Sequence, residues 1–368
     1  MIRVERYNLY YSNIPLKKPF ITALRRVESA ESIVVELICT DGIVGYGAAS
    51  PTAAITGDTL GSIAYALDKM LLPSIVGKEL KCDLLGTVGV GLLHNSGAKS
   101  ALDIAIYDAL SKAAGLPLFR YLGGVKRSFV NDLTISIGSP ERMAHDAVEA
   151  AATGVGALKL KLVGDGRDDE RINAVSDAVP SVELRLDPNQ SWTLDEAKRV
   201  LGSCKNARIT LVEQPFHFSD RINGSILKKC VSIPIMADES VFSPEDAETV
   251  LSGGEADIVN IKLAKSGGIY PSLKINEAAK RHGGKCLVGC MLENPIATAA
   301  AAHFALACDN CVGVDLDVPC LLEYDPVLSN VSFENGVVSL RDEDAGLGIK
   351  ELGRLSMIAE SFGMGERN

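Results

Sequence analysis

Hydrophobic and polar residues follow a regular period between about residues 126 and 320 of this chain. Short apolar runs of strand length end in polar or charged side chains. Stretches of helical length, opened by Ser, Thr or Asp and by acidic residues, follow them. Eight runs have this strand-like character: NDLTISIG, ALKLKL, VELRLDPNQ, ITLVEQP, IPIMADES, ADIVNIKL, KCLVGCMLE and CVGVDLDVP. This alternation predicts an α/β fold, and eight repeats predict a TIM-like barrel.

Five charged residues stand at or near the ends of successive runs, at nearly equal intervals. They are Lys161, Asp187, Glu213, Asp238 and Lys262, and the steps between them are 26, 26, 25 and 24 residues. Each step is close to the length of one strand, one helix and two short connections. Because the C-terminal strand ends of a (β/α)8 barrel meet at one mouth, we expect these side chains to line a single site.

Three of the five residues are carboxylates. They offer only oxygen ligands, which favours a hard cation such as Mg²⁺ over zinc, for which histidine or cysteine would be expected. The alternative is that each carboxylate caps the helix that follows, as Asp238 before Glu239 and Ser240 could do. None of the five histidines stands at a comparable strand end, so we do not expect a histidine base.

The first ladder lysine belongs to a strand of alternating character. In the run 158–162, Lys159 and Lys161 face one side of the predicted strand and the leucines face the other. Inside a barrel, two neighbouring ammonium groups repel each other and are partly desolvated, which lowers their pKa and suits a general base. The alternative is an edge strand whose lysines are solvated.

The chain on either side of the barrel has a different pattern. Residues 1–125 predict an α+β domain, with strands near 3–11 and 32–39 followed by helices. The barrel is expected to occupy residues 126–320. After it the period stops, and we expect the segment 321–368, with its strand-like VSFENGVVSL, to return to the first domain.

Composition and charge restrict the function further. A net charge of −10 and a pI near 5.1 argue against a nucleic-acid surface, which needs clustered lysine and arginine. The most apolar helical run, PIATAAAAHFALAC, has about 14 residues, whereas a bilayer span needs roughly 20. The N-terminus lacks the apolar core of a signal peptide, and nine cysteines in mostly apolar stretches favour reduced thiols. We therefore predict a cytoplasmic protein without a membrane segment.

Five short motifs resemble those of the enolase superfamily, in particular its muconate-lactonizing-like subgroup. They are LKLKL, DPNQSW at Asp187, EQP at Glu213, ADES at Asp238 and NIKLAKSGG at Lys262, and the resemblance extends over nearly the whole chain. It implies a (β/α)7β barrel with an α+β capping domain and a Mg²⁺ cofactor. It also implies a first step in which a base removes the proton on the carbon beside a substrate carboxylate.

By this resemblance, two lysine bases imply 1,1-proton transfer, which is racemisation or epimerisation at one carbon. Lys161 and Lys262 would lie across the mouth from each other, so each could address one face of the same carbon. By the resemblance, Lys159 supports Lys161 and the substrate carboxylate. Lys265 is the alternative second base, although Lys262 is nearer the strand end and matches the family motif. The sequence Lys265-Ser-Gly-Gly268 could bind an anion at a helix start, or could only end the strand.

The last strand carries a second acidic motif. In the run 314–317 the period of two places Asp315 and Asp317 on the same, inward face. Five acids in one mouth are costly without cations, and a cationic substrate group would meet that cost. The motif resembles the feature by which dipeptide epimerases hold the substrate α-ammonium. The alternative is a surface pair in a loop before Pro319.

Weaker clues concern the remainder of the substrate. Residues 18–26 and 50–59 resemble the lid loops of epimerases that act on L-Ala-D/L-Glu, in which the counterpart of Arg25 would pair with the glutamate side chain. Arg25 could equally be a solvated loop charge. Thr134 and Glu293 occupy substrate-shell positions of the family, but the sequence after Glu293 departs from the usual Ser/Thr-rich version and leaves the side-chain preference open.

The sequence thus predicts a Mg²⁺-dependent dipeptide epimerase acting at the α-carbon of the C-terminal residue, with L-Ala-D/L-Glu from murein peptide turnover as the expected substrate. The alternatives are an epimerase of hydrophobic or basic dipeptides, a lyase or cycloisomerase such as o-succinylbenzoate synthase or muconate cycloisomerase, and a non-catalytic homologue. A small-molecule substrate is expected, and by resemblance a homo-oligomer.

Overall fold

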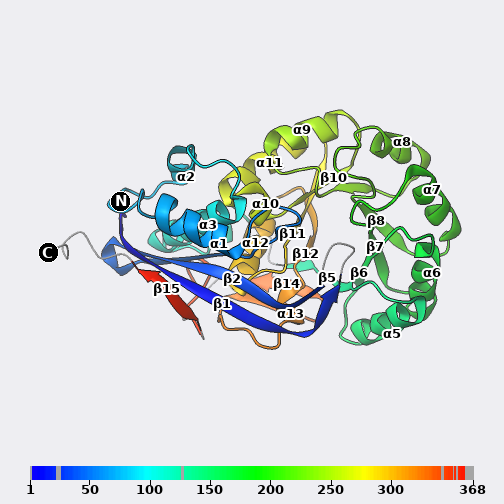
Figure 1. The fold of residues 1–368 in the computed structure, drawn as a ribbon, viewed down its shortest axis with the longest axis horizontal. Helices are drawn as coiled ribbons and strands as arrows, with labels where there is room; N and C mark the ends of the chain where they lie inside the picture. Colours follow the sequence, from blue (N-terminus) through cyan, green and yellow to red (C-terminus); the bar gives the residue numbers. More distant parts are fainter. Residues whose placement is uncertain are drawn as a thin grey trace.

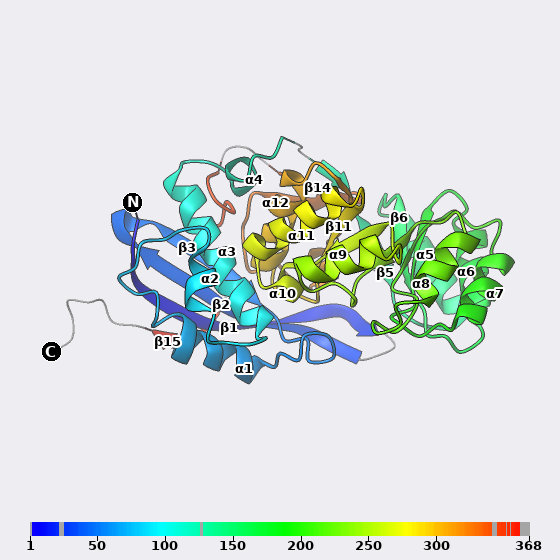
Figure 2. The ribbon, with the colours of Figure 1, turned by 90° about the horizontal axis from the view of Figure 1, so that it is seen from above.

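The computed structural model describes residues 2–21, 26–125, 128–340, 344–350, 352–353 and 355–360. Its ribbon divides into two parts that lie side by side (Figure 1). An α+β part, blue to cyan, contains the N-terminus, and strands and helices coloured green to orange form the barrel. Figure 2 shows the same two parts from above.

The capping part is built on an antiparallel sheet in the order β15-β1-β2-β3. The bounds are β1 (Val4–Ile21), β2 (Arg26–Cys39), β3 (Val44–Ala49) and β15 (Ser356–Glu360), with the helical elements η1 (Thr40–Gly42), α1 (Leu60–Tyr65), η2 (Ala66–Leu71), α2 (Leu84–Val88), α3 (Ser96–Ala113) and α4 (Leu118–Tyr121). Both faces of β2 are buried. Ile33 and Val35 pack with the capping helices, whereas Val34 packs with residues of the barrel. The sheet therefore joins two hydrophobic cores.

The β1–β2 hairpin is longer than the sequence suggests. Part of the predicted lid loop is strand, since β1 continues to Ile21 and pairs there with Arg26 at the start of β2. The prolines cost no hydrogen bonds with β2, because Pro15 turns its backbone toward the other edge, where its carbonyl accepts the N–H of Glu323 (2.9 Å), and because the pairing with β2 is interrupted between Pro15 and Phe20. The hairpin runs from the capping part to the barrel (Figures 1 and 2), where the backbone N–H of Ile21 donates to Ser136 Oγ (3.2 Å).

Eight parallel strands in chain order form the barrel sheet, within the described residues. They are β5 (Asp132–Ile135), β6 (Ala157–Lys161), β7 (Glu183–Asp187), β8 (Ile209–Glu213), β9 (Ile235–Ala237), β10 (Ile258–Ile261), β11 (Lys285–Gly289) and β12 (Cys311–Asp315). All eight coincide with the predicted runs. A parallel bridge between Asn131 and Val314 closes the ring.

Helices cover the connections between these strands: α5 (Pro140–Ala151), α6 (Asp168–Ala178), α7 (Leu194–Ser203), α8 (Asn223–Cys230), α9 (Pro244–Ser252), α10 (Leu263–Ser266), α11 (Ile269–Arg281) and α12 (Pro295–Ala307). The apolar helix α12 is buried along nearly its whole length, as predicted. In the described part of the chain, none of the helices is long and apolar enough to cross a membrane.

The position of an eighth barrel helix is occupied differently. The short helix α13 (Val318–Leu321) follows β12. Next comes a hairpin of β13 (Val331–Glu334) and β14 (Val337–Leu340), in which β14 also pairs with β4 (Ser128–Val130). Its turn, Asn335-Gly336, has positive φ at both residues, as a tight hairpin requires. The architecture is therefore a (β/α)7β barrel with an α+β cap, which confirms the predicted fold class.

Candidate active site

The ladder residues stand at the same end of consecutive strands. Lys161, Asp187 and Glu213 are the last residues of β6, β7 and β8, while Asp238 and Lys262 directly follow β9 and β10. All five are buried. In the eight-membered ring β6 and β10 lie opposite each other, and the three strands between them each carry one carboxylate.

Short contacts connect these side chains. Lys161 Nζ lies 2.5 Å from Asp187 Oδ2, and Lys262 Nζ lies 2.6 Å from Asp238 Oδ2 and 3.9 Å from Glu213 Oε1. The alternative interpretation of the carboxylates as helix caps is wrong for α7 and α9, because Thr193 and Ser243 cap those helices.

Lys159 is the most enclosed of the lysines. Its Nζ lies 2.6 Å from Glu213 Oε2, 2.7 Å from Asp315 Oδ2 and 3.1 Å from Asp187 Oδ2. The strand that carries it, β6, pairs with β5 on one side and β7 on the other, so the edge-strand alternative is wrong. Lys159 thus neutralises negative charge from three strands at the centre of the barrel.

The predicted lowering of the lysine pKa is wrong for Lys159, and the pKa of Lys262, for which no shift was predicted, is raised as well. Burial alone would lower both values, as expected from desolvation, but the carboxylates outweigh it and raise both pKa values above the usual range for lysine. The largest opposing contributions come from Asp315 at Lys159 and from Asp238 at Lys262. Repulsion between neighbouring lysines was the expected effect, whereas the Nζ atoms of Lys159 and Lys262 each lie 2.6 Å from a carboxylate oxygen.

The pKa values of the three ladder carboxylates are shifted in different directions. Burial raises the pKa of Glu213 to about 8, with a further contribution from the negative charge of Asp187. At Asp187 and Asp238 burial has the same tendency, but the neighbouring ammonium groups, above all Lys161 and Lys262, lower both pKa values. The lysines therefore favour the ionised form of Asp187 and Asp238, whereas burial and the charge of Asp187 disfavour the ionised form of Glu213.

The oxygen atoms at this end of the barrel fit a hard cation. All three ladder acids offer oxygen ligands. Two further buried oxygens beside them, Glu239 Oε2 and Asn260 Oδ1, have no hydrogen-bond partner among the described residues, although Asn260 Nδ2 donates to Glu213 Oε1 (2.9 Å). A buried polar atom without a partner is costly, so the donor set is suited to a ligand that binds oxygen.

Polar neighbours hold the carboxylates in place. Gln214 Oε1 accepts the backbone N–H groups of Asp238 (2.8 Å) and Ser240 (3.1 Å), and Asp187 Oδ1 accepts the N–H of Asn189 (3.0 Å). The predicted site residues do not include Gln214, Asn189, Glu239 or Asn260. Each of the four lies within or beside one of the family motifs, which could have indicated a role. Their contacts, however, join different strands and are visible only in the folded structure.

Lys265 occupies a deeper position than Lys262. Its Nζ contacts Asp238 Oδ1 (2.5 Å) and the carbonyl oxygens of Asp238 and Asn260, behind the carboxylate. Burial lowers its pKa. Of the two lysines, Lys262 lines the pocket at the mouth and Lys265 does not. The structure therefore favours Lys262 over Lys265 for contact with a substrate.

The pocket lies between the barrel mouth and the capping domain. The barrel contributes charged side chains from several strands, among them Lys159, Lys161, Asp238 and Lys262. Phe20 of β1, Ala54 and Ile55 of the capping domain, Leu292, and Leu321 of α13 contribute apolar surface. Such a mixture of apolar wall and few charged groups is typical of small-molecule sites.

Asp315 and Asp317 both line this pocket, from the strand end of β12 and the turn after it. Asp315 is paired with Lys159, so part of the predicted charge conflict is met by the protein itself. Asp317 Oδ2 accepts the backbone N–H of Thr134 (2.8 Å), and among the described residues Asp317 forms no ion pair. Burial, with the charge of Asp315, raises the pKa of Asp317 to about 6.

Of the remaining predicted site residues, one lines the pocket, one is buried near it and one is outside the described residues. Thr134 of β5 lines the pocket. Glu293 is buried behind it, next to the lining residues Met291 and Leu292, and its burial raises its pKa to about 7. Arg25 lies outside the described residues.

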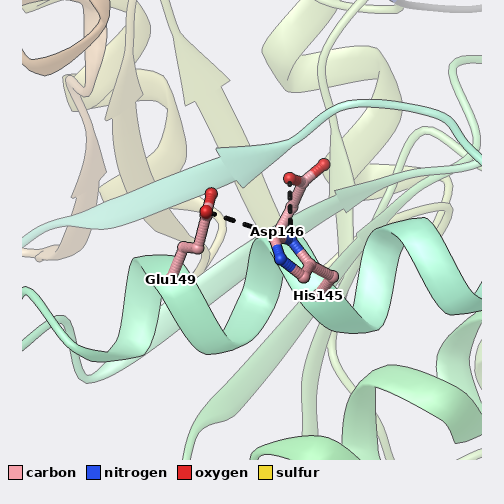
Figure 3. A group of neighbouring side chains, drawn as sticks. All are labelled: His145, Asp146 and Glu149. Atoms are coloured by element: carbon pink, nitrogen blue, oxygen red, sulfur yellow. Dashed lines mark ion pairs between the residues drawn. The ribbon is translucent and has the colours of Figure 1, made fainter.

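A second cluster of possible metal ligands lies on the surface of α5. His145, Asp146 and Glu149 point toward one another (Figure 3). Cations of the protein already pair with both acids: Arg142 with Asp146 (2.9 Å) and Lys18 with Glu149 (2.7 Å). We interpret this cluster as a network of surface charges.

His303 provides a pH-dependent term in stability. It is fully buried on α12, Nδ1 accepts the N–H of Phe119 (3.0 Å), and Nε2, which therefore carries the proton, donates to Asn330 Oδ1 (2.8 Å). Burial lowers its pKa from 6.5 to about 4. Because the unfolded chain takes up this proton first, the folded state is expected to lose about 3 kcal/mol as the pH falls from 6.5 to 4, and none above 6.5.

The measurement is denaturant unfolding of the wild type and of His303→Gln across that pH range. The other titrating groups are common to both proteins, so the difference between the two curves isolates the histidine. A constant difference between pH 6.5 and 4 would contradict the assignment.

A capped (β/α)7β barrel with lysines and carboxylates at its mouth defines an enolase-like protein, and comparison with known families gives the same class. The model "Enolase C-terminal domain-like" matches residues 142–351, and "Mandelate racemase / muconate lactonizing enzyme, N-terminal domain" matches residues 7–123. The chain belongs to the mandelate racemase / muconate lactonizing enzyme family of the enolase superfamily.

Individual relatives are similar over almost the full length. An L-Ala-D/L-Glu epimerase of Clostridium acetobutylicum is 40% identical over 344 residues, 92% of this chain and 96% of that protein. The substrate-liganded L-Ala-D/L-Glu epimerase of Bacillus subtilis superposes with a TM-score of 0.92 at 39% identity, over 96% of this chain and 100% of that one. A dipeptide epimerase of Enterococcus faecalis complexed with Mg and L-Leu-L-Tyr gives 0.90 at 37% identity, over 95% and 100%.

Proposed function

We propose that this protein is a Mg²⁺-dependent dipeptide epimerase, which moves a proton between the two faces of the α-carbon of the C-terminal residue. One observation carries the proposal. Lys161 and Lys262 reach the same pocket from β6 and β10, on opposite sides of the barrel. A carbon held between them presents one face to each lysine. The epimerase activities named for the similar proteins support the same reaction.

Asp187, Glu213 and Asp238 are the residues that would hold the cation, since they are the three oxygen donors on adjacent strands between the two lysines. Bound there, Mg²⁺ supplies stabilisation of the negative charge that develops on the substrate carboxylate when the α-proton leaves. The E. faecalis relative was crystallised with Mg, which supports this choice of metal.

The lysines divide the proton transfer between them. In one direction the neutral amine of Lys161 takes the α-proton, and the ammonium group of Lys262 delivers a proton to the opposite face. In the other direction the roles exchange. Lys159 does not reach across to the opposite face; its charge lies beside Asp187 and Glu213, where the carboxylate end of the substrate belongs.

Asp315 and Asp317 define the other end of the substrate. They lie on the opposite arc of the ring from the three cation ligands, so a dipeptide would run from its carboxylate at β7–β9 to its ammonium group at β12. Asp317 in particular offers a carboxylate that is free of ion pairs within the described residues. An ammonium group there would form a charge-assisted hydrogen bond. Substrates of lyases and cycloisomerases of the superfamily lack this group, which makes those activities the weaker alternative.

L-Ala-D/L-Glu is the proposed preferred substrate, on the similarity to two epimerases of that specificity and on the assignment of Arg25 to the glutamate side chain. Hydrophobic or basic dipeptides are the alternatives. The assignment of residues 1–125, 126–320 and 321–368 to cap, barrel and returning segment also stands as a proposal. So do a cytoplasmic location, which the nine free cysteines support, and a homo-oligomer.

The test is deuterium incorporation at the α-carbon in D₂O with Mg²⁺, for a panel of L,L-dipeptides and their N-acetylated forms. Because acetylation removes the ammonium group that Asp317 binds, we expect kcat/KM to fall about 10- to 100-fold for the acetylated partner of each active dipeptide. Asp317→Asn should shrink this ratio. Equal rates for free and acetylated dipeptides would exclude an ammonium subsite at Asp317. Silence of the whole panel would favour the lyase and cycloisomerase alternatives.

A further inference from the structure

The connection from β10 to α11 carries the proposed base Lys262 at its start. It continues through α10 to Gly267 and Gly268, and α11 begins at Ile269. The sequence suggested that an anion could bind where the two glycines open the helix. The structure shows that an anion of the chain itself occupies this position: Asp103 Oδ2 of the capping helix α3 accepts the backbone N–H groups of Ile269 (2.5 Å) and Tyr270 (3.0 Å). A carboxylate is favoured at a helix N-terminus by both hydrogen bonding and the helix dipole.

The contact is deeply buried and closely packed. Asp103 has no exposed surface, and its second oxygen, Oδ1, has no hydrogen-bond partner in the part of the chain that the structure describes. Gly268 has a φ of 120°, and a Cβ added there would lie 2.4 Å from the Cβ of Asp103. Glycine is therefore required for the approach. A buried carboxylate is costly unless it is well bonded, so the two N–H donors are its principal compensation.

The β10–α11 connection is therefore held at both ends. At its beginning, Lys262 and Lys265 both contact Asp238. At its end, Asp103 binds the first N–H groups of α11. The anchor belongs to the capping domain, whereas Lys262 belongs to the barrel. Within the described part of the chain, Lys161 has no comparable link to the capping domain, because the sheet pairing of β6 and the contact with Asp187 come from the barrel itself.

We propose that Asp103 is a positioning residue for Lys262: through the N-terminus of α11 it fixes the connection that sets the Nζ of Lys262 against one face of the substrate α-carbon. This inference rests on the proposed function. The expected effect is asymmetric, because among the described residues only Lys262 of the two lysines is anchored in this way. Removal of Asp103 should impair proton transfer at the face of Lys262 and spare the face of Lys161.

The experiment compares epimerisation with α-proton exchange in D₂O for the two epimers of one substrate. A Lys262→Ala variant first identifies the epimer that Lys161 deprotonates, as the one that still exchanges. In Asp103→Ala we expect epimerisation to fall about 10- to 100-fold, because a small displacement of a reacting group has that effect. Exchange of the epimer served by Lys161 should stay within about twofold of the wild type, so the ratio of exchange to epimerisation rises.

Asp108 provides a matched control on the same helix. It is equally buried and also accepts two backbone N–H groups, those of Tyr46 (2.9 Å) and Leu347 (2.7 Å), but neither belongs to the β10–α11 connection. Asp108→Ala should leave the ratio of exchange to epimerisation unchanged even if it lowers stability. Asp103→Asn keeps an oxygen that can accept both N–H groups, so it should restore most of the activity, and it replaces Asp103→Ala if that variant does not fold.

Backbone amide hydrogen exchange tests the anchor without any substrate. Amides of residues 262–272 should exchange faster in Asp103→Ala than in the wild type, and should not do so in Asp108→Ala. Unchanged protection in this segment, or an equal loss of exchange for both epimers, would overturn the proposal. If the wild type itself exchanges no α-proton while Asp103→Ala still loosens residues 262–272, the proposed function fails and the anchor stands.

Discussion

Lys161→Ala and Lys262→Ala are each expected to lose epimerisation by about three orders of magnitude, since a positioned general base contributes on that scale. Each variant should still exchange the α-proton of one epimer with solvent, and the two variants should preserve opposite epimers. The reason is geometric: the lysines reach the pocket from β6 and β10, across the ring from each other. Deuterium incorporation into each pure epimer, followed by mass and chiral analysis, measures both quantities.

Lys285 offers a control for the loss of a lysine. It is exposed and begins β11 at the other end of the barrel, so Lys285→Ala should retain full activity. If both active-site variants preserved exchange of the same epimer, the two lysines would not address opposite faces. If either variant still epimerised at the wild-type rate, that lysine would not be a base.

Removal of one cation ligand should have an effect of similar size. We expect Glu213→Gln to lower kcat/KM on the order of 10³-fold and to weaken Mg²⁺ binding, because metal stabilisation of the developing charge is worth several kcal/mol. Glu213 sits between the other two ligands and contacts Lys159 as well. Calorimetric titration with Mg²⁺ and activity before and after chelation give the two readouts.

The matched control lies on the neighbouring strand. Glu183 is the first residue of β7, at the end opposite the ligand Asp187, and it pairs only with Arg208 among the described residues. Glu183→Gln should bind Mg²⁺ with wild-type affinity. Normal Mg²⁺ affinity in Glu213→Gln, or full activity of the wild type after complete chelation, would remove the metal from the proposal.

The barrel and its mouth were predictable because their signals are local. Each strand is one apolar run, and each ladder residue lies at the end of its own run, so the sequence alone places Lys161 or Asp187 correctly on a strand end. The hairpin was harder. Pro15 and Pro19 suggest a loop, but Pro15 faces away from β2 and binds Glu323, a residue more than 300 positions away, and the pairing with β2 is irregular between Pro15 and Phe20.

Features that depend on contacts between distant segments were not predictable. The raised pKa of Lys262 follows from Asp238, whose carboxylate lies 2.6 Å from its Nζ, and such distances exist only after folding. The bond from Asp103 to Ile269 joins residues 166 positions apart. The sequence of two glycines before a helix indicated an anion site, but nothing in the sequence indicated that the anion was part of the chain.

The most direct test of two-lysine proton transfer uses the wild type alone. In D₂O with Mg²⁺, one pure epimer of Ala-Glu is converted, and substrate and product are analysed by mass in the first few percent of reaction. Two bases predict that the new epimer carries one deuterium from the first turnovers, because its proton comes from the second lysine, which has equilibrated with solvent. A product that retains the substrate's own proton in these early turnovers would show that one base serves both faces, and would contradict the assignment of Lys161 and Lys262 as a pair.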